Sequence, residues 1–182
     1  LLIFDEVQCG LGRSGYLWAH QEAGVTPDIM TLAKPLAGGL PIGATLVTEA
    51  VAQSMKPGDH GSTFGAGPLV CRAAQVVFDR VAQPEFLSSV RSTGKYLLER
   101  LRTLAPIGLV EVRGAGLLVG AEFSDSVQPL IDAAADHGLL AISAGENVLR
   151  LCPPLIVSTA QIDAAIDIIA DCLPRHSSLD NI

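Results

Sequence analysis

Short blocks of apolar residues mark the first part of the chain. Three of them have the length of a buried strand and are bounded by proline, glycine or charged residues: Leu1–Val7, Ile29–Ala33 and Ala44–Thr48. A glycine-rich loop, GLGRSG, and a helix-like stretch over Trp18–Ala23 separate the first two blocks. The order strand, helix, strand predicts a βαβ unit, in which the two strands run parallel and the crossover is right-handed.

The spacing of apolar residues becomes helical after Pro68, which is a favourable first residue for a helix. A second helix is predicted over Glu85–Leu104. Shorter elements of both kinds follow: strands at Leu109–Arg113, Leu117–Phe123, Leu139–Ile142 and Val148–Leu151, a helix at Val127–His137 closed by Gly138, and a last helix capped by Ser158 or Thr159 that runs to about Leu173. The fold class is therefore α/β, with one domain over residues 1–85 and a small α+β domain over 86–182.

Composition narrows the class of protein. The 182 residues are 49% hydrophobic and 17% charged, and the net charge is −7. The negative charge argues against a nucleic-acid partner, and the absence of an apolar run of roughly 18 residues argues against a membrane helix. The four cysteines lack the spacing of zinc ligands, so no metal site is predicted. Their wide, irregular spacing predicts reduced thiols, as in an intracellular protein.

Two adjacent carboxylates, Asp5 and Glu6, end the first apolar block. This arrangement matches the Walker B pattern, in which the aspartate holds Mg²⁺. That interpretation needs a partner loop of the form G-x-x-x-x-G-K-[ST]. The Gly94-Lys95 pair does not supply it, because position 89 is serine and position 96 is tyrosine. A P-loop ATPase fragment therefore stays open only if the loop lies outside this chain.

A lysine follows the second apolar block. Lys34 comes directly after Ile29–Ala33 and before Pro35. A desolvated site there would lower its pKa and make the amine nucleophilic, although a lone lysine in this place is more readily an ordinary surface residue. If the first two strands are parallel, Asp5 and Lys34 share the carboxyl edge of the sheet, where open α/β folds bind ligands. An amine that forms a Schiff base and a carboxylate facing a ring nitrogen are what pyridoxal 5'-phosphate needs.

Two further stretches could bind charged groups. GSTFGAG offers the hydroxyls of Ser62 and Thr63, accessible backbone N–H groups and a helix start near Pro68, all of which suit a phosphate. A plain capped loop would have the same sequence. Arg150, in NVLRLCPPL, is of the residue type that recognises carboxylates bidentately, although a partly exposed strand arginine is the commoner interpretation.

Taken together and in order, these stretches resemble the class III, or ornithine-type, aminotransferases. The resemblance rests on DEVQ-x-G-x-G-R-x-G, a lysine 29 positions after Asp5, HGSTF, VRGAGLLVG and NVLRLCPPL, and it covers residues 1 to about 173. It implies a pyridoxal-phosphate transferase of fold type I. The chain would hold the second half of the large, mostly parallel-sheet domain and the small carboxyl-terminal domain. We therefore expect a fragment of a longer enzyme, one that is inactive alone.

The resemblance also implies individual roles. Asp5 would pair with the pyridine nitrogen and Gln8 would lie against the ring hydroxyl. Lys34 would carry the cofactor as a Schiff base and move the proton. Thr63 would bind the phosphate of the partner subunit's cofactor in a homodimer, beside Ser62, which would touch the substrate, and Arg150 would bind the substrate's carboxylate.

The same resemblance implies a reaction. The amino donor would be N2-acetyl-L-ornithine and the acceptor 2-oxoglutarate, a step of arginine biosynthesis. Ornithine or 4-aminobutyrate as donor, and an inactive scaffold that only dimerises, are the alternatives. One departure lies in the phosphate loop, where the family has Gly-Gly-Asn-Pro and this chain has Gly65-Ala66-Gly67-Pro68. The compartment would be the chloroplast or mitochondrion in a plant, alga or fungus and the cytoplasm otherwise.

Overall fold

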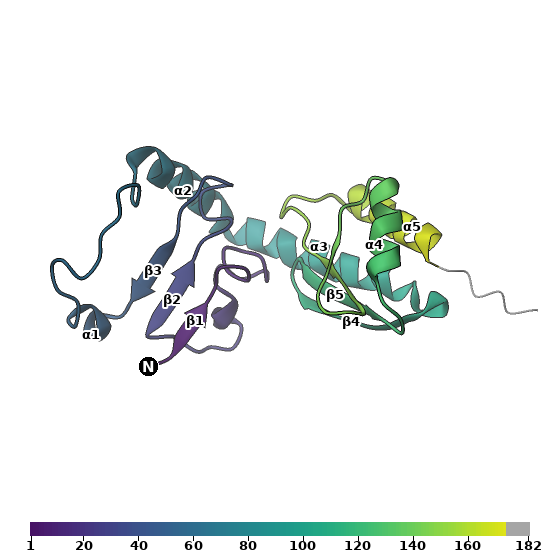
Figure 1. The fold of residues 1–182 in the computed structure, drawn as a ribbon, viewed down its shortest axis with the longest axis horizontal. Helices are drawn as coiled ribbons and strands as arrows, with labels where there is room; N and C mark the ends of the chain where they lie inside the picture. Colours follow the sequence, from purple (N-terminus) through teal and green to yellow (C-terminus); the bar gives the residue numbers. More distant parts are fainter. Residues whose placement is uncertain (174–182) are drawn as a thin grey trace, which may run out of the picture. The chain divides into compact units, whose positions relative to one another are not determined.

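The computed structural model describes residues 1–173, so the tail that ends the predicted second domain lies outside the described residues. The chain divides into two compact units, Leu1–Ser89 and Val90–Ile182 (Figure 1). This division and the predicted boundary after residue 85 both fall within one helix, α3 (Pro84–Arg102). Each unit is described by itself.

A three-stranded sheet organises the first unit. Its order is β1 (Ile3–Asp5), β2 (Ile29–Leu32) and β3 (Ala44–Val47), with β1 parallel to β2 and β3 antiparallel to β2 (Figure 1). The predicted parallel pair is thus confirmed. Because the two strands run in the same direction, their carboxyl ends share one edge of the sheet.

The predicted helix over Trp18–Ala23 is wrong in type and length. The structure has a single 3₁₀ turn, Ala19–Gln21, in which the Trp18 backbone N–H donates to Gln21 Oε1 at 3.1 Å. Gly24, at φ +64°, follows directly and leaves no room for a second helical turn before the chain returns to β2. The crossover between the parallel strands is therefore a loop.

Apolar residues from the loop and from β2 form the core of the first unit. Leu11, Met30, Leu32 and Leu36 are buried together, and Ala74 of α2 (Pro68–Val81) packs against them. Helix α2 begins at Pro68, as the sequence predicts. A short helix, α1 (Glu49–Ala52), was not predicted, because four residues are too few to show a helical period.

The second unit is an antiparallel sheet with helices. Its strands are in the order β4, β5, β7, β6, and α4 packs against α5 (Figure 1). The bounds are β4 Leu109–Ala115, β5 Leu118–Phe123, α4 Gln128–Asp136, β6 Ile142–Ser143, β7 Val148–Leu151 and α5 Thr159–Cys172. Ser158 caps α5 as predicted, since its hydroxyl accepts a hydrogen bond from the Gln161 backbone at 3.2 Å.

The strand predicted over Leu139–Ile142 is largely absent. Gly138, at φ +84°, ends α4 as predicted, and the Leu139 N–H donates back to the carbonyl of Ala134 at 2.8 Å. This is the hydrogen bond of a Schellman motif, so Leu139 closes the helix and cannot join a strand ladder. Of the predicted strand, only its last residue, Ile142, forms part of a strand, and that strand is β6 (Ile142–Ser143), which pairs with β7.

Helix α3 approaches the β4–β5 turn at a glycine. A Cβ atom on Gly94 would lie 2.1 Å from the carbonyl oxygen of Gly116 and 2.8 Å from its Cα. The two backbones are therefore in direct contact, which only a residue without a side chain allows.

A polar network joins α3 to α5. The Tyr96 hydroxyl and Arg100 Nε both donate to Asp163 Oδ1, at 2.7 and 2.6 Å. These two hydrogen bonds hold the pKa of the Asp163 carboxyl below its usual range. A carboxylate with a depressed folded pKa adds stability above its unfolded pKa, and that contribution is lost as the pH falls through the folded value.

Replacing Asp163 with asparagine should therefore lower the urea midpoint at about pH 7, and this difference should shrink as the pH falls through the folded pKa of the Asp163 carboxyl. The effect is modest because the network lies at the surface. Asp132→Asn is the matched control, because its exposed carboxylate contacts only the neighbouring Gln128 side chain at 2.8 Å among the bonds of the described residues. Equal midpoint changes in the two variants would contradict the assigned role.

Candidate active site

Asp5 is the last residue of β1 and lies opposite Thr31 of β2 in the parallel register. Its Oδ1 atom accepts hydrogen bonds from the Val7 backbone N–H at 2.9 Å and from the Thr31 hydroxyl at 3.2 Å. The side chain is nevertheless exposed. The carboxylate is thus oriented by two donors on one oxygen at the carboxyl edge of the sheet.

Lys34 lies just past the end of β2, at the same edge as Asp5. It starts a tight turn, in which the Leu36 N–H donates to the carbonyl of Ala33 at 2.7 Å. Its φ is +20°, at the margin of the left-handed region that side chains other than glycine rarely adopt. Lys34 is exposed among the described residues, which agrees with the interpretation as a surface lysine and not with a desolvated one in this chain by itself.

Gln8 lies in the turn that follows β1 and is half-buried there. The Gly10 N–H closes this turn by donating to the carbonyl of Glu6 at 3.0 Å. Sequence position alone thus brings Gln8 close to the strand end that carries Asp5.

Glu6 has a defined place that the sequence analysis did not assign. Its side chain is only 3% exposed. Oε2 accepts from the Ala19 N–H at 2.8 Å, and Oε1 accepts from the His20 N–H at 2.9 Å and faces His20 Nδ1 at 3.0 Å. Glu6 follows the last residue of β1, and its side chain is held by the loop at Ala19–His20, whereas the Asp5 side chain is exposed at the sheet edge.

The Cys9 thiol completes the surroundings of Glu6. Sγ lies 3.6 Å from Glu6 Oε2 and 3.5 Å from the carbonyl oxygen of Asp5. Burial, followed by the charge of Glu6, raises the pKa of the Cys9 thiol, so Cys9 stays protonated and can donate.

The predicted phosphate loop is exposed and lies before α2. Ser62 Oγ accepts a hydrogen bond from the Gly65 N–H at 2.9 Å, and Thr63 follows within this turn. The segment between α1 and α2 runs along the β3 side of the sheet, away from β1 (Figure 1). Thr63 thus belongs to an exposed segment that is separate in sequence from the strand ends carrying Asp5 and Lys34.

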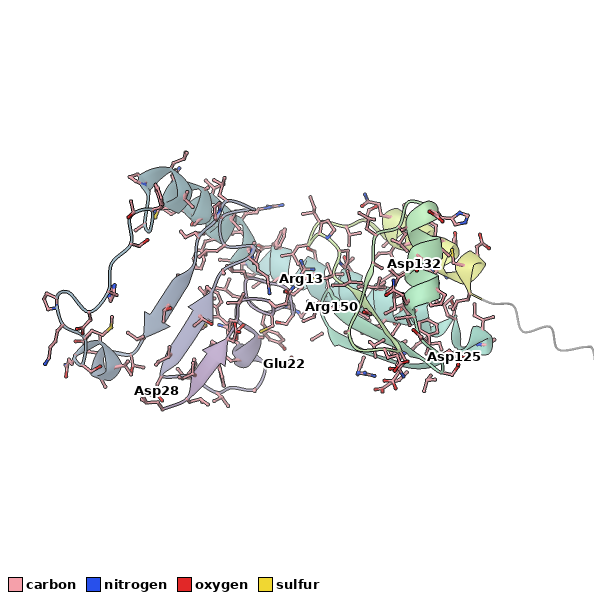
Figure 2. All side chains as sticks on the ribbon, in the orientation of Figure 1. Arg13, Glu22, Asp28, Asp125, Asp132 and Arg150 are labelled. Atoms are coloured by element: carbon pink, nitrogen blue, oxygen red, sulfur yellow. The ribbon has the colours of Figure 1, made fainter. Side chains whose placement is uncertain are left out.

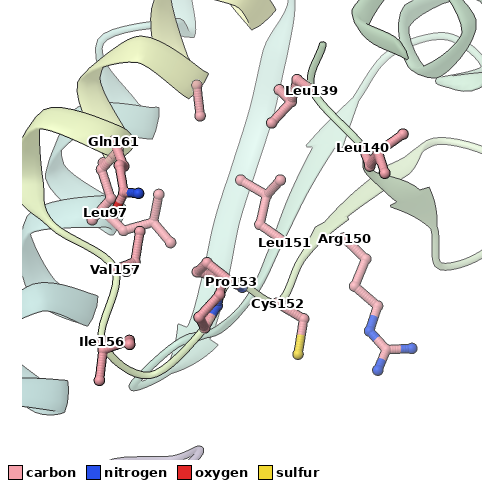
Figure 3. A pocket seen from close by; sticks show the side chains of 13 residues that line it. Leu97, Leu139, Leu140, Arg150, Leu151, Cys152, Pro153, Ile156, Val157 and Gln161 are labelled. Atoms are coloured by element: carbon pink, nitrogen blue, oxygen red, sulfur yellow. The ribbon is translucent and has the colours of Figure 1, made fainter.

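Arg150 belongs to the second unit. It lies on β7 between Gly120 of β5 and Ile142 of β6 and is half-buried. Its side chain borders a cavity of about 530 Å³ whose other walls are mostly apolar, including Leu97, Leu151 and Pro153 (Figure 3). The guanidinium itself extends away from these apolar side chains, so the cavity and the guanidinium do not face one another (Figure 3).

Metal-binding clusters and membrane-spanning helices would indicate other classes of function. Within residues 1–173, no three His, Cys, Asp or Glu side chains gather in a way that could hold a metal ion. No helix of that part of the chain has the length and apolarity needed to cross a membrane.

Comparison with known proteins identifies the class. The profile of the aminotransferase class-III family matches residues 1–173, and the chain therefore belongs to this family. Its members depend on pyridoxal phosphate. Membership leaves the Walker B interpretation of Asp5 and Glu6 without support, and the buried Glu6 is not placed to activate a water molecule.

Individual relatives are more specific. The chain is 55% identical over 184 residues to the mitochondrial acetylornithine aminotransferase of Alnus glutinosa, covering 97% of this chain and 40% of that protein. The solved acetylornithine aminotransferase of Elizabethkingia anophelis is 34% identical with a TM-score of 0.86, covering 95% of this chain and 48% of that one.

A further solved structure concerns the cofactor. The chain is 30% identical to the solved ornithine aminotransferase of Toxoplasma gondii, with a TM-score of 0.86, covering 94% of this chain and 43% of that one. That protein was crystallized with oxidized glutathione and is described with partial occupancy of PLP at its active site. The predicted fold is thus confirmed. The chain spans about half the length, or less, of the relatives it matches.

Proposed function

We propose that the full-length protein transfers the amino group of N2-acetyl-L-ornithine to 2-oxoglutarate, with pyridoxal 5'-phosphate as cofactor. The observation that carries this proposal is the placement of Asp5 and Lys34 at one edge of a parallel strand pair in a class-III aminotransferase. The donor follows from the acetylornithine aminotransferases among the similar proteins.

The residues of the chain fit the cofactor. A pyridine ring needs a carboxylate at its nitrogen, and Asp5 offers an exposed carboxylate that two donors hold on one oxygen. An amine is needed beside it, and Lys34 is exposed at the same edge. A phosphate needs hydroxyl and N–H donors, which the exposed loop of Ser62 and Thr63 provides.

When bound, pyridoxal phosphate supplies an electron sink that stabilises negative charge at the substrate's reacting carbon. Asp5 would hold a proton at the ring nitrogen, and Gln8 would contact the ring from the adjoining turn. Lys34 Nζ would hold the cofactor and carry a proton to and from the substrate carbon as general base and acid.

Two residues are assigned separately to substrate binding. Arg150 would bind a carboxylate of the donor or acceptor through two parallel hydrogen bonds, with Ser62 as a further contact. The segment between α1 and α2, which contains Thr63, runs along the β3 side of the sheet, and this supports the assignment of Thr63 to the phosphate of the partner subunit's cofactor in a homodimer (Figure 1).

A second donor has support from one observation. Ornithine aminotransferases are found among the similar solved structures, at almost the same TM-score as an acetylornithine enzyme. Ornithine is therefore the alternative donor, and 4-aminobutyrate follows it.

The Alnus glutinosa relative is named mitochondrial, so an intracellular compartment, the mitochondrion or the chloroplast, is the proposed location.

The test is a comparison of donors with purified full-length protein. Pyridoxal phosphate should produce a visible absorption band, and kcat/KM with 2-oxoglutarate should be higher for N-acetylornithine than for ornithine or 4-aminobutyrate by about tenfold or more. A band without transamination of any of the three donors would contradict the proposed reaction. A protein that gains no band would contradict the proposed cofactor.

A further inference from the structure

Glu6 is a buried carboxylate whose neighbours are all hydrogen-bond donors. The Ala19 N–H, the His20 N–H and the His20 ring surround its two oxygens at 2.8, 2.9 and 3.0 Å. The Cys9 thiol adds a fourth, longer contact at 3.6 Å. A buried charge is costly unless donors compensate it in this way, so the side chain is held by a complete set of partners.

Only a carboxylate satisfies this set. A glutamine has one acceptor oxygen and an NH₂ group, and that NH₂ group would face N–H donors. The space is closed as well, since a Cβ atom on Gly10 would lie 3.1 Å from Glu6 Oε2 and 2.7 Å from the Glu6 carbonyl oxygen. The Glu6 side chain therefore lies directly beneath the turn that ends at Gly10.

The same turn orients Asp5. The Val7 N–H that donates to Asp5 Oδ1 belongs to it, and its closing hydrogen bond runs from the Gly10 N–H to the Glu6 carbonyl. The Cys9 thiol contacts both the Asp5 carbonyl oxygen and the Glu6 carboxylate. Loss of the Glu6 carboxylate would thus loosen both the distant loop at Ala19 and the turn that holds Asp5.

We infer that Glu6 is a positioning residue: its buried carboxylate ties the loop at Ala19–His20 to the turn after β1 and thereby aims the Asp5 carboxylate at the ligand edge of the sheet. The benefit to cofactor binding rests on the proposed function. The connection that Glu6 makes between the loop at Ala19–His20 and the turn after β1 is independent of the proposed function.

Hydrogen exchange tests the tie without cofactor. In the full-length protein, Glu6→Gln should speed amide exchange by roughly tenfold in peptides covering residues 18–22 and also in those covering 5–10. Glu22→Gln is the matched control, because Glu22 is an exposed glutamate on the adjoining 3₁₀ turn and its loss should leave both regions unchanged (Figure 2). Faster exchange at 18–22 with no change at 5–10 would overturn the inference.

Cofactor affinity supplies the second measurement. Glu6→Gln should raise the Kd for pyridoxal phosphate by roughly tenfold relative to wild type and Glu22→Gln, because a misaimed Asp5 no longer pairs with the ring nitrogen. An unchanged Kd together with a lowered melting temperature would reduce Glu6 to a purely structural role and overturn the inference. Wild-type protein that binds no pyridoxal phosphate would refute the proposed function, while the exchange data would still decide the tie.

A milder variant keeps the test decisive if Glu6→Gln fails to fold. His20→Leu removes one donor and leaves the carboxylate in place. Like Glu6→Gln, it should speed amide exchange at residues 5–10 and raise the Kd for pyridoxal phosphate, but only a few-fold. His20→Asn, which can return an N–H near the position of Nδ1, should restore part of the loss. Equal behaviour of the leucine and asparagine variants at both readouts would count against the inference.

Discussion

Replacing Lys34 with alanine should abolish transamination by the full-length protein while leaving it folded. The lysine side chain is exposed in the turn after β2, so its removal costs little packing. Its amine, in contrast, is the group that would hold the cofactor and move the proton. General acid–base catalysis alone is worth up to about 10⁴-fold, so a fall in kcat of at least about 10³-fold is expected.

The measurement is kcat with N-acetylornithine and 2-oxoglutarate, beside the melting temperature. Lys56→Ala is the matched control, since Lys56 is also an exposed lysine in a turn of the first unit. Lys34→Arg keeps the positive charge but offers no nucleophilic amine, and it should be as inactive as the alanine variant. If Lys34→Ala retained kcat within about tenfold of wild type, another amine would have to carry the chemistry.

Replacing Gly94 with alanine should destabilise the second unit by about 3 kcal/mol, near the upper end for overpacking. The added Cβ would meet backbone atoms of Gly116, at 2.1 Å from the oxygen and 2.5 Å from the carbonyl carbon. Backbone atoms cannot rotate aside as a side chain can, so α3 or the β4–β5 turn must shift. Helix propensity alone would predict the opposite sign, a gain of about 1 kcal/mol.

Urea unfolding followed by circular dichroism gives the free energy of unfolding for this comparison. Gly61→Ala is the control substitution, since a Cβ on Gly61 would have no atom within 4 Å. Its free energy of unfolding should stay within about 0.5 kcal/mol of wild type. A Gly94→Ala protein as stable as wild type would mean that the helix and the turn are not in direct contact.

The elements that could be predicted from the sequence are those with local causes. The apolar blocks gave the parallel strands, Pro68 gave the start of α2, and Ser158 or Thr159 gave the capped start of α5, where Ser158 is the cap. The two helix starts depend on residues close in sequence, whereas the strands are marked by their own apolar blocks although they pair residues such as Ile3 and Ile29. The edge position of Asp5 and Lys34 also followed, because it requires only that two strands be parallel.

What the sequence did not disclose depends on contacts between distant positions. Glu6 is satisfied by the backbone and ring of His20, and nothing near Glu6 in sequence indicates that partner. Leu139 looked like the start of a strand because its role in closing α4 depends on hydrogen bonding and not on hydrophobicity. The sequence left both a desolvated and an exposed Lys34 open, because burial at a strand end depends on which segments cover it.

The positive φ of Lys34 has a consequence for protein engineering. A residue with a side chain held at the margin of the left-handed region costs on the order of 1 kcal/mol, and glycine would relieve that cost. A library selected for thermostability alone should therefore enrich glycine at position 34 and lose the amine in the process. If Lys34 has the proposed role, directed evolution of the full-length protein needs a selection for turnover in every round, since stability and the proposed catalysis favour different residues at that one position.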